Sequence, residues 1–233
     1  MNSEIVDFYI LHQRKYQENS LLASIFTCEH GKVSAIIRVN KKQANFYQPL
    51  VKLRGELILA KKDTGLSRVV NIEYAESFYK KSYINLLSLQ YINELLYLLL
   101  SYSHEEFVLF QKYGFILQNI DDANYKYLLR MFELELLKSM GHGIYVNQDT
   151  LNQDIVNDGD YHIVNGGFKP SANQMINTVK GKYLLKINQS IASWDCLDLK
   201  VISRVVRLNI NYLLAGKELK SRKLLIDSLN LNS

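Results

Sequence analysis

The hydrophobic pattern of the chain changes near residue 80. Before that point, short runs rich in Val, Ile, Phe and Tyr alternate with polar, turn-rich pieces, a pattern typical of β-strands. The runs are residues 7–13, 21–27, 32–39, 50–59 and 68–75. After that point, apolar residues recur at helical spacing, as at Leu87, Tyr91, Leu95 and Leu98. The chain is therefore predicted to be α+β, with a β-rich domain over residues 1–80 and a mainly helical domain over residues 81–233.

Five strands this close together indicate a small barrel or a sandwich, and the spacing alone leaves both open. Helices are predicted within residues 82–103, 105–120, 125–143, 189–216 and 222–229. Gly141 and Gly143 are placed to end the third helix, Gly216 the fourth, and Ser221 is a candidate cap for the last. Asn165-Gly166 separates two strand-like flanks, which predicts a small hairpin insertion near residues 160–170.

Composition limits the class of protein. With 48% hydrophobic and 22% charged residues, the 233-residue chain can bury an ordinary core. Its net charge of +5 weakly favours anionic partners such as nucleic acid, acidic peptides or lipid. Cys28 and Cys196 form no CxxC pair, so we expect a reducing, cytoplasmic location without a disulfide framework. No signal peptide is expected, and the apolar run at 86–103 is interrupted by polar residues, so no membrane contact is predicted.

Patterns typical of catalysis are incomplete. HEEFV at 104–108 has Val108 where a zinc protease needs its second histidine. GHGIYV at 141–146 lacks the third glycine of a dinucleotide loop, and no GxxxxGK[ST] motif occurs. Asp121-Asp122 and the pair Glu133 and Glu135 show no metal-site pattern. We therefore expect a protein that is not an enzyme and uses no cofactor. A Mg²⁺-dependent nuclease that uses these carboxylates stays an alternative.

Basic residues of the β-rich part fall in or near turns and strand ends. Tyr16, Phe46 and Tyr47 are interleaved with them. Cations that neutralise phosphates and rings that stack on unpaired bases are what a single-strand binding groove requires. The alternative is a solubilising surface with the aromatic rings in the core. The candidate nucleic-acid contacts here are Arg14, Lys15, Arg38, Lys41, Lys42, Lys52, Arg54, Lys61 and Lys62.

The helical part carries basic residues of its own. Lys200, Arg204 and Arg207 are four and then three residues apart and so share one side of a helix. The stretch GKELKSRKLL at 216–225 adds further candidate nucleic-acid contacts, which are Lys217, Lys220, Arg222 and Lys223. Arg130 lies among apolar residues in LLRMFELELL. Its charge is predicted either to snorkel outward to solvent or to bind an acidic partner. The alternative is a salt bridge with Glu133 or Glu135, of which Glu133 has the better helical spacing.

Five segments together point to a known family. They are KYQENSLLASIFTCEHGKVSAIIR, QPL, YINELL, RMFELELLKSMGHGI and GKELKSRKLL, in this order along the chain. In order and spacing the chain resembles the bacterial recombination mediator RecO family over nearly its whole length. The resemblance implies an N-terminal OB-fold barrel and a helical C-terminal domain. It also implies binding of single- and double-stranded DNA, annealing of complementary strands, and help, with RecR, for RecA to load onto DNA coated by single-strand-binding protein (SSB).

The resemblance also assigns roles to residues. Arg130 takes the position that holds the acidic, apolar C-terminal tail of SSB. The basic turn after the third strand maps onto Arg38, Lys41 and Lys42, and the KSR segment onto Lys220, Ser221 and Arg222. Many family members carry a four-cysteine zinc site, but residues 144–180 contain no cysteine, so no bound zinc is predicted. A cytoplasmic, nucleoid-associated location follows from this reading.

Two further alternatives use the same residues differently. A binding module for structured RNA could use the barrel surface, and it would prefer RNA and make no contact with SSB. An adaptor would bind protein partners and ignore nucleic acid.

Overall fold

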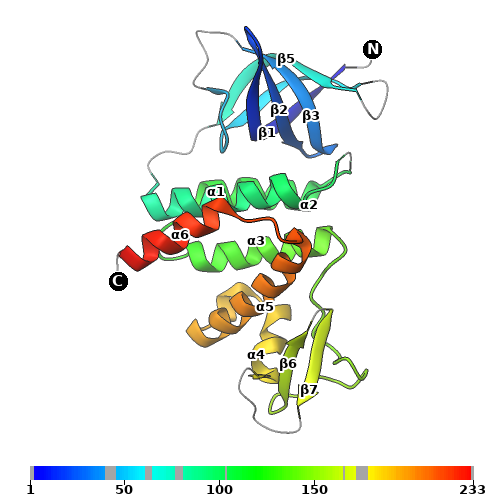
Figure 1. The fold of residues 1–233 in the computed structure, drawn as a ribbon, viewed down its shortest axis with the longest axis vertical. Helices are drawn as coiled ribbons and strands as arrows, with labels where there is room; N and C mark the ends of the chain where they lie inside the picture. Colours follow the sequence, from blue (N-terminus) through cyan, green and yellow to red (C-terminus); the bar gives the residue numbers. More distant parts are fainter. Residues whose placement is uncertain are drawn as a thin grey trace. The chain divides into compact units, whose positions relative to one another are not determined.

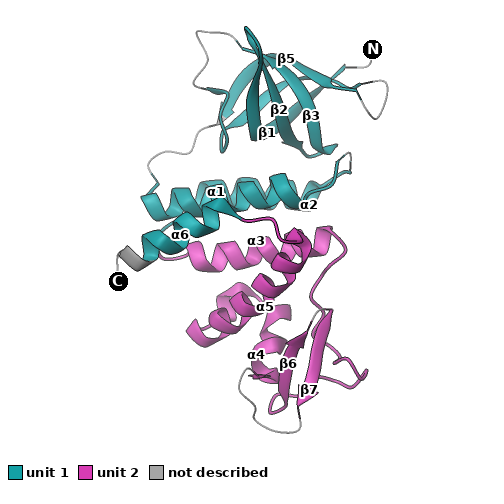
Figure 2. Cartoon of the chain, viewed as in Figure 1, with its two compact units in different colours: residues 1–122, 219–233 teal, residues 123–218 magenta. Residues whose placement is uncertain are grey.

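The computed structural model describes residues 3–39, 46–60, 65–76, 81–102, 104–164, 166–171 and 178–231 (Figure 1). The chain forms two compact units (Figure 2). One contains residues 1–122 and 219–233, and the other contains residues 123–218. These units differ from the domains predicted over residues 1–80 and 81–233, and the domain boundary at residue 80 stays a prediction.

Strands of the first unit close into a barrel. They are β1 (Ser3–Gln17), β2 (Ser20–Thr27), β3 (Gly31–Arg38), β4 (Lys52–Ile58) and β5 (Ser67–Glu76). Their order around the barrel is β1-β2-β3-β5-β4, and β3 and β5 are parallel while the other neighbours are antiparallel. The structure confirms a five-stranded OB-fold barrel in place of the sandwich that the sequence also allowed.

Alternation along each strand fills the barrel. Phe8 and Ile10 of β1, Ile25 of β2, Ile37 of β3 and Leu53 of β4 are fully buried in one core. Their sequence neighbours point to the outer face because successive side chains of a strand alternate. The β2–β3 connection requires Gly31, which has a φ of +55°. A Cβ at this position would lie 2.1 Å from the carbonyl oxygen of His104.

Three helices complete the described part of the first unit. They are α1 (Tyr83–Leu99), α2 (Phe107–Asn119) and α6 (Lys220–Leu231). Rings of Tyr9 and Phe26 from the barrel pack with Phe110 and Tyr113 of α2 at centroid distances of 4.8 to 6.2 Å. Tyr113 donates to Asn93 of α1, and burial raises the pKa of Tyr113 well above 10.0, so the hydroxyl keeps its proton. This aromatic cluster fixes α2 against the barrel.

The second unit combines two long helices with a small sheet. Helix α3 (Tyr125–Ser139) packs against α5 (Cys196–Leu214), and the sheet has the order β7-β6-β8. Its strands are β6 (Asp160–Val164), β7 (Gly167–Ser171) and β8 (Thr178–Lys180), followed by α4 (Gly181–Leu185) and the 3₁₀ turns η2 (Lys186–Asn188) and η3 (Ile191–Ser193). Strands β6 and β7 are the predicted hairpin, although Asn165 of its turn lies outside the described residues.

Backbone geometry at the helix ends agrees in part with the sequence analysis. Gly141 has a φ of +76° just after α3, and Gly216 has a φ of +86° after α5, as expected for helix ends. Helix α5 begins with a reciprocal capping box between Asp195 and Asp198, which the sequence analysis did not single out. Among the described residues, no helix combines the length and apolar character that crossing a membrane demands.

Candidate nucleic-acid interface

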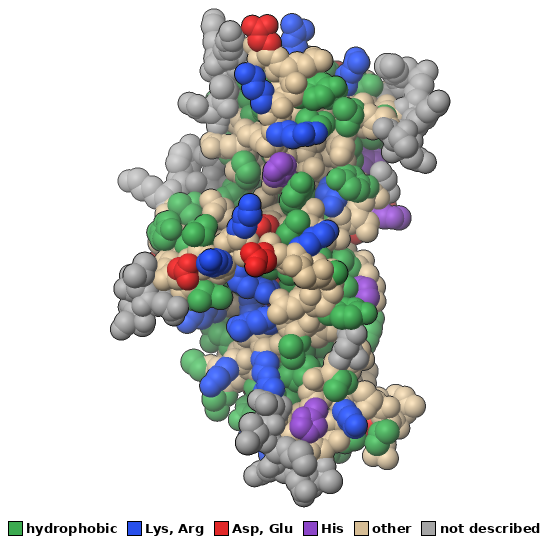
Figure 3. Space-filling model, in the orientation of Figure 1, with side chains coloured by type: hydrophobic (Ala, Val, Ile, Leu, Met, Phe, Trp, Pro, Cys, Tyr) green, Lys and Arg blue, Asp and Glu red, His purple; other side chains and the backbone are tan. Residues whose placement is uncertain are grey.

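Arg14 and Arg38 lie on the outer face of the barrel. Arg14 pairs across β1 and β2 with Leu22, and Arg38 pairs across β3 and β2 with Ser20. Leu22 and Ser20 alternate with Leu21, which packs against the core, so the two arginines share the opposite, solvent-facing side. Both side chains are exposed. Basic side chains are visible on the barrel surface in Figure 3.

Lys15 occupies a different row. It pairs with Leu21, which in turn pairs with the buried Ile37, so its row faces the core. Because the Lys15 side chain is nevertheless exposed, it emerges at the end of the barrel. Lys41, Lys42, Lys61 and Lys62 lie outside the described residues.

Lys52 and Arg54 of β4 are joined to an acidic residue of β1. Nζ of Lys52 lies 3.0 Å from Oδ2 of Asp7, and Nε of Arg54 donates to Oδ1 at 2.7 Å. Partial burial acts to raise the pKa of Asp7, but the hydrogen bonds and charges of Arg54 and Lys52 outweigh it and hold that pKa below 3.8. The Asp7 carboxylate therefore neutralises part of the positive charge that the sequence offers at this strand.

These paired charges lie in a groove between the barrel and helix α2, with a volume of about 500 Å³. Exposed rings of Phe107 and Phe115 line it from the α2 side. Two cations meet two carboxylates there, because Glu29 is also part of the lining. The groove consequently carries no excess positive charge, unlike the outer face at Arg14 and Arg38.

The aromatic residues that the sequence suggested as stacking platforms differ in their exposure. Tyr47 is only 5% exposed and belongs to the barrel core, so the prediction that it is available to bases was wrong and the core alternative holds for it. Tyr16 and Phe46 are exposed. The Phe46 ring lies 5.1 Å from that of Tyr74 on β5, a partner that the sequence analysis missed because the contact joins distant segments.

The basic side of α5 is only partly open. Lys200 and Arg207 are exposed, whereas Arg204, between them in sequence, is half-buried and engaged in an interaction of its own. Spacings of four and three residues place the three on one side of the helix, as predicted.

The C-terminal basic stretch also separates by environment. Lys217, Lys220 and Lys223 are exposed. Arg222 is half-buried and turns toward α1, where Nη2 donates to the Tyr91 hydroxyl at 3.2 Å and the guanidinium lies 5.5 Å from the ring centroid. The sequence places these residues together, but the structure gives Arg222 a contact inside the protein.

The start of α6 corrects the proposed cap at Ser221. The helix begins at Lys220, so Ser221 lies within its first turn. The carboxylate of Glu94 on α1 accepts the backbone N–H groups of Lys220 and Ser221 at 3.1 and 2.9 Å, and it also accepts the Ser221 hydroxyl. A side chain 126 residues away in sequence therefore caps the helix, which local sequence patterns do not reveal.

Arg130 forms the intrahelical pair that the sequence allowed. Its Nη2 donates to Oε1 of Glu133 at 2.7 Å, and its Nε lies 2.6 Å from Oε2. The Glu133 side chain is 1% exposed and that of Arg130 is 13% exposed. The guanidinium is thus held on α3 by a buried carboxylate.

Comparison with known proteins identifies the family. Residues 1–78 match the family model for the recombination protein O N-terminal domain, and residues 80–223 match the model for its C-terminal domain. The chain belongs to the RecO family. It is 63% identical over 228 residues to the DNA repair protein RecO of Francisella tularensis subsp. novicida, covering 98% of each chain. It is 31% identical to the DNA repair protein RecO of Pseudoalteromonas atlantica, covering 96% of this chain and 95% of the relative.

The cysteine-free segment 144–180 is organised near its start by a carboxylate. Asp149 accepts the backbone N–H groups of Leu151 and Gln153 at 2.7 and 3.1 Å. The N–H of Ile155 donates to the carbonyl of Asn147 at 3.1 Å. The described residues hold no group of three His, Cys, Asp or Glu residues placed to bind a metal. The absence of bound zinc stays a prediction that rests on the missing cysteines.

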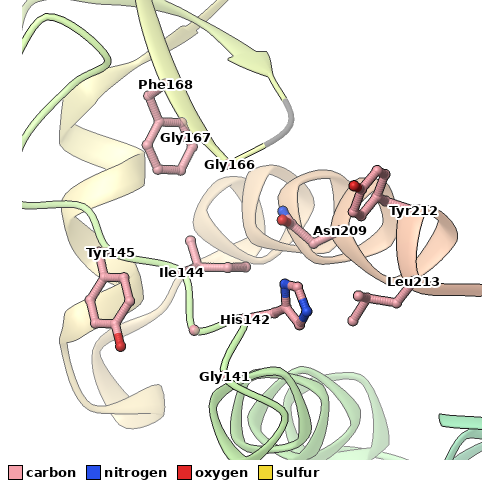
Figure 4. A pocket seen from close by; sticks show the side chains of 11 residues that line it. Gly141, His142, Ile144, Tyr145, Gly166, Gly167, Phe168, Asn209, Tyr212 and Leu213 are labelled. Carbon is pink, nitrogen blue, oxygen red and sulfur yellow. The ribbon is translucent and has the colours of Figure 1, made fainter.

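A second hollow lies in the other unit of this RecO-family chain. Its volume is about 200 Å³, and Figure 4 shows His142, which follows α3, facing Asn209 and Leu213 of α5, with Phe168 of β7 on a further wall. Gly141 and Gly143, which also line the hollow, were predicted only to end the third helix. The hollow itself has no local sequence signal, because its lining comes from segments far apart along the chain.

Proposed function

We propose that the protein is a DNA-binding recombination mediator. In this role it anneals complementary single strands and, with RecR, helps RecA load onto SSB-coated DNA during recombinational repair. The observation that carries the proposal is the full-length match to the RecO family, whose curated members are named DNA repair proteins. An OB-fold barrel with Arg14 and Arg38 exposed on its outer face fits this function.

Electrostatics supplies the mechanism. Two complementary strands repel each other through their phosphates, and cations that replace condensed counterions relieve this repulsion. Exposed basic residues of the barrel, of α5 and of the stretch 217–223 provide such cations. Base pairing itself then drives annealing, so no covalent step, nucleotide or metal cofactor is needed and the protein acts without being an enzyme.

Contact with SSB is proposed to run through Arg130. Glu133 already occupies its guanidinium, so an incoming carboxylate would have to share Arg130 with Glu133. An Arg side chain has five N–H donors, which makes such sharing chemically possible. The proposed partners are single- and double-stranded DNA, the SSB tail and RecR directly, and RecA indirectly. The proposed location is the cytoplasm at the nucleoid, with no membrane contact.

The decisive experiment measures annealing of two complementary strands coated with SSB, without nucleotide and without Mg²⁺. The protein should accelerate duplex formation relative to buffer, and bare strands serve as the control for SSB dependence. Acceleration of bare strands alone would leave a DNA-binding protein without the SSB function. No acceleration of either would overturn the proposal.

The nuclease alternative is weakened by what its carboxylates contact. Asp122 accepts hydrogen bonds from Ser82 and Asn85 at the start of α1, and Glu133 pairs with Arg130. Repeating the assay with Mg²⁺ and end-labelled strands tests it directly, because a nuclease would shorten the strands. The RNA-binding alternative predicts tighter binding of RNA than of DNA of the same sequence.

A further inference from the structure

A row of four side chains crosses the outer face of the barrel. Strand register pairs Arg14 of β1 with Leu22 of β2, Leu22 with Ile36 of β3, and Ile36 with Arg68 of β5. Paired residues of neighbouring strands point to the same face. The row therefore has an arginine at each end and two aliphatic side chains between them. We call it the arginine row.

Burial confirms the direction of this row. Ala35, Ile37 and Val69, the sequence neighbours of Ile36 and Arg68, belong to the barrel core. Leu22 and Ile36 are half-buried, and Arg14 and Arg68 are exposed. Arg68 was not among the residues suggested by the sequence, because its place in the row depends on the parallel pairing of β3 with β5.

Charge distinguishes this row from the other basic pair of the barrel. Lys52 and Arg54 share the carboxylate of Asp7, which neutralises part of their charge, as described above. Within the residues that the structure describes, no acidic side chain pairs with Arg14 or Arg68. The two ends of the arginine row therefore keep their charge for an external anion.

We propose that Arg68 is a DNA-contacting residue that acts together with Arg14 on one single strand, whose bases lie against Leu22 and Ile36. This inference rests on the proposed function and assigns the chemistry of one site within it. Three intervals between neighbouring strands separate the two arginines, roughly 14 Å in all. At 3.4 Å per nucleotide for a stacked strand, that distance spans roughly four nucleotides. A length of about four nucleotides lies within the range that single OB-folds bind.

The chemistry of the row favours a single strand over a duplex. Cations at both ends can hold phosphates of a continuous backbone. The aliphatic pair offers apolar contact, which only unpaired bases can use because a duplex keeps its base faces stacked inside. Phosphate contacts and base contacts should therefore be separable by mutation.

The test measures binding of a fluorescent eight-nucleotide oligo-dT by anisotropy across a salt series. Arg68→Ala should lower the salt slope by about 0.7 and weaken binding about fivefold at 0.1 M salt, because one fewer counterion is displaced. Arg68→Lys keeps the charge and should keep the slope. Lys169→Ala removes an exposed cation of β7 in the other unit and should change neither quantity.

A second variant separates bases from phosphates. Ile36→Ser should weaken binding of the single strand while leaving the salt slope unchanged, since it removes apolar contact and no charge. Thermal unfolding of each variant checks that the barrel is intact. An unchanged slope in Arg68→Ala, with tight binding by the unmodified protein, overturns the arginine row and leaves the proposed function standing. Absence of binding by the unmodified protein overturns both.

Discussion

Asp7 makes the stability of the barrel depend on pH. Its pKa in the folded protein lies below 3.8, so its ion pairs contribute fully above that value and are lost as pH falls through the lowered pKa. Because the pair is partly exposed, we expect a contribution of roughly 1 kcal/mol or less.

Asp7→Asn should therefore lower the free energy of unfolding at pH 7 by up to about 1 kcal/mol and reduce its decline below pH 4. Urea denaturation at several pH values measures both effects. Glu18→Gln removes an exposed carboxylate of the β1–β2 turn and serves as the control. An unchanged acid dependence in the Asp7 variant would contradict the pairing.

Arg130 shows how a functional test can be confounded by stability. Replacing it with Ala leaves the Glu133 carboxylate buried without its guanidinium, which should cost about 3 kcal/mol of unfolding free energy. The double variant Arg130→Ala with Glu133→Gln should recover much of that loss, since the buried charge is then gone. Urea denaturation checks both, and a loss below about 0.5 kcal/mol in the single variant would show that the carboxylate finds other compensation.

Helix α6 is the clearest case of an element fixed from outside. In its first turn, the backbone N–H groups of Lys220 and Ser221 donate to Glu94 of α1, and the Arg222 side chain donates to the Tyr91 hydroxyl. Glu94→Ala should lower the free energy of unfolding by about 1–2 kcal/mol and speed amide exchange in residues 220–231, because two backbone donors lose their acceptor. Glu218→Ala removes an exposed carboxylate just before the helix and should have little effect. Equal exchange rates in both variants would refute capping by Glu94.

Strands and helices were predicted correctly from the sequence where the segment was long enough to show a hydrophobic period. Runs of seven to ten residues indicated β1 to β5, and longer runs indicated α1, α2, α3 and α5. Strand β8 and helix α4 span three and five residues, too few to show a period. Strand β1 extends to Ser3 because its N-terminal half pairs with β4, and that long-range pairing leaves no local signal.

The boundary that the sequence pattern indicates differs from the boundary between the two compact units of the structure. The change of periodicity lies near residue 80, and the family models meet at residues 78 and 80. The compact units instead group α1, α2 and α6 with the barrel. Helix α2 belongs to the barrel unit because the aromatic cluster around Tyr9 and Tyr113 packs it against the barrel. Helix α6 belongs to the same unit because Glu94 of α1 caps its first turn.

The sequence by itself determined the fold class, the family and the supply of basic residues, because periodicity, motif order and charge are local properties. Only the tertiary structure decided which cations are free. It paired Lys52 and Arg54 with the carboxylate of Asp7, turned Arg222 onto Tyr91, and brought Arg68 into register with Arg14. Each of these outcomes depends on strand register or helix packing. Whether a basic side chain is available to a partner depends on which side chains the fold places beside it.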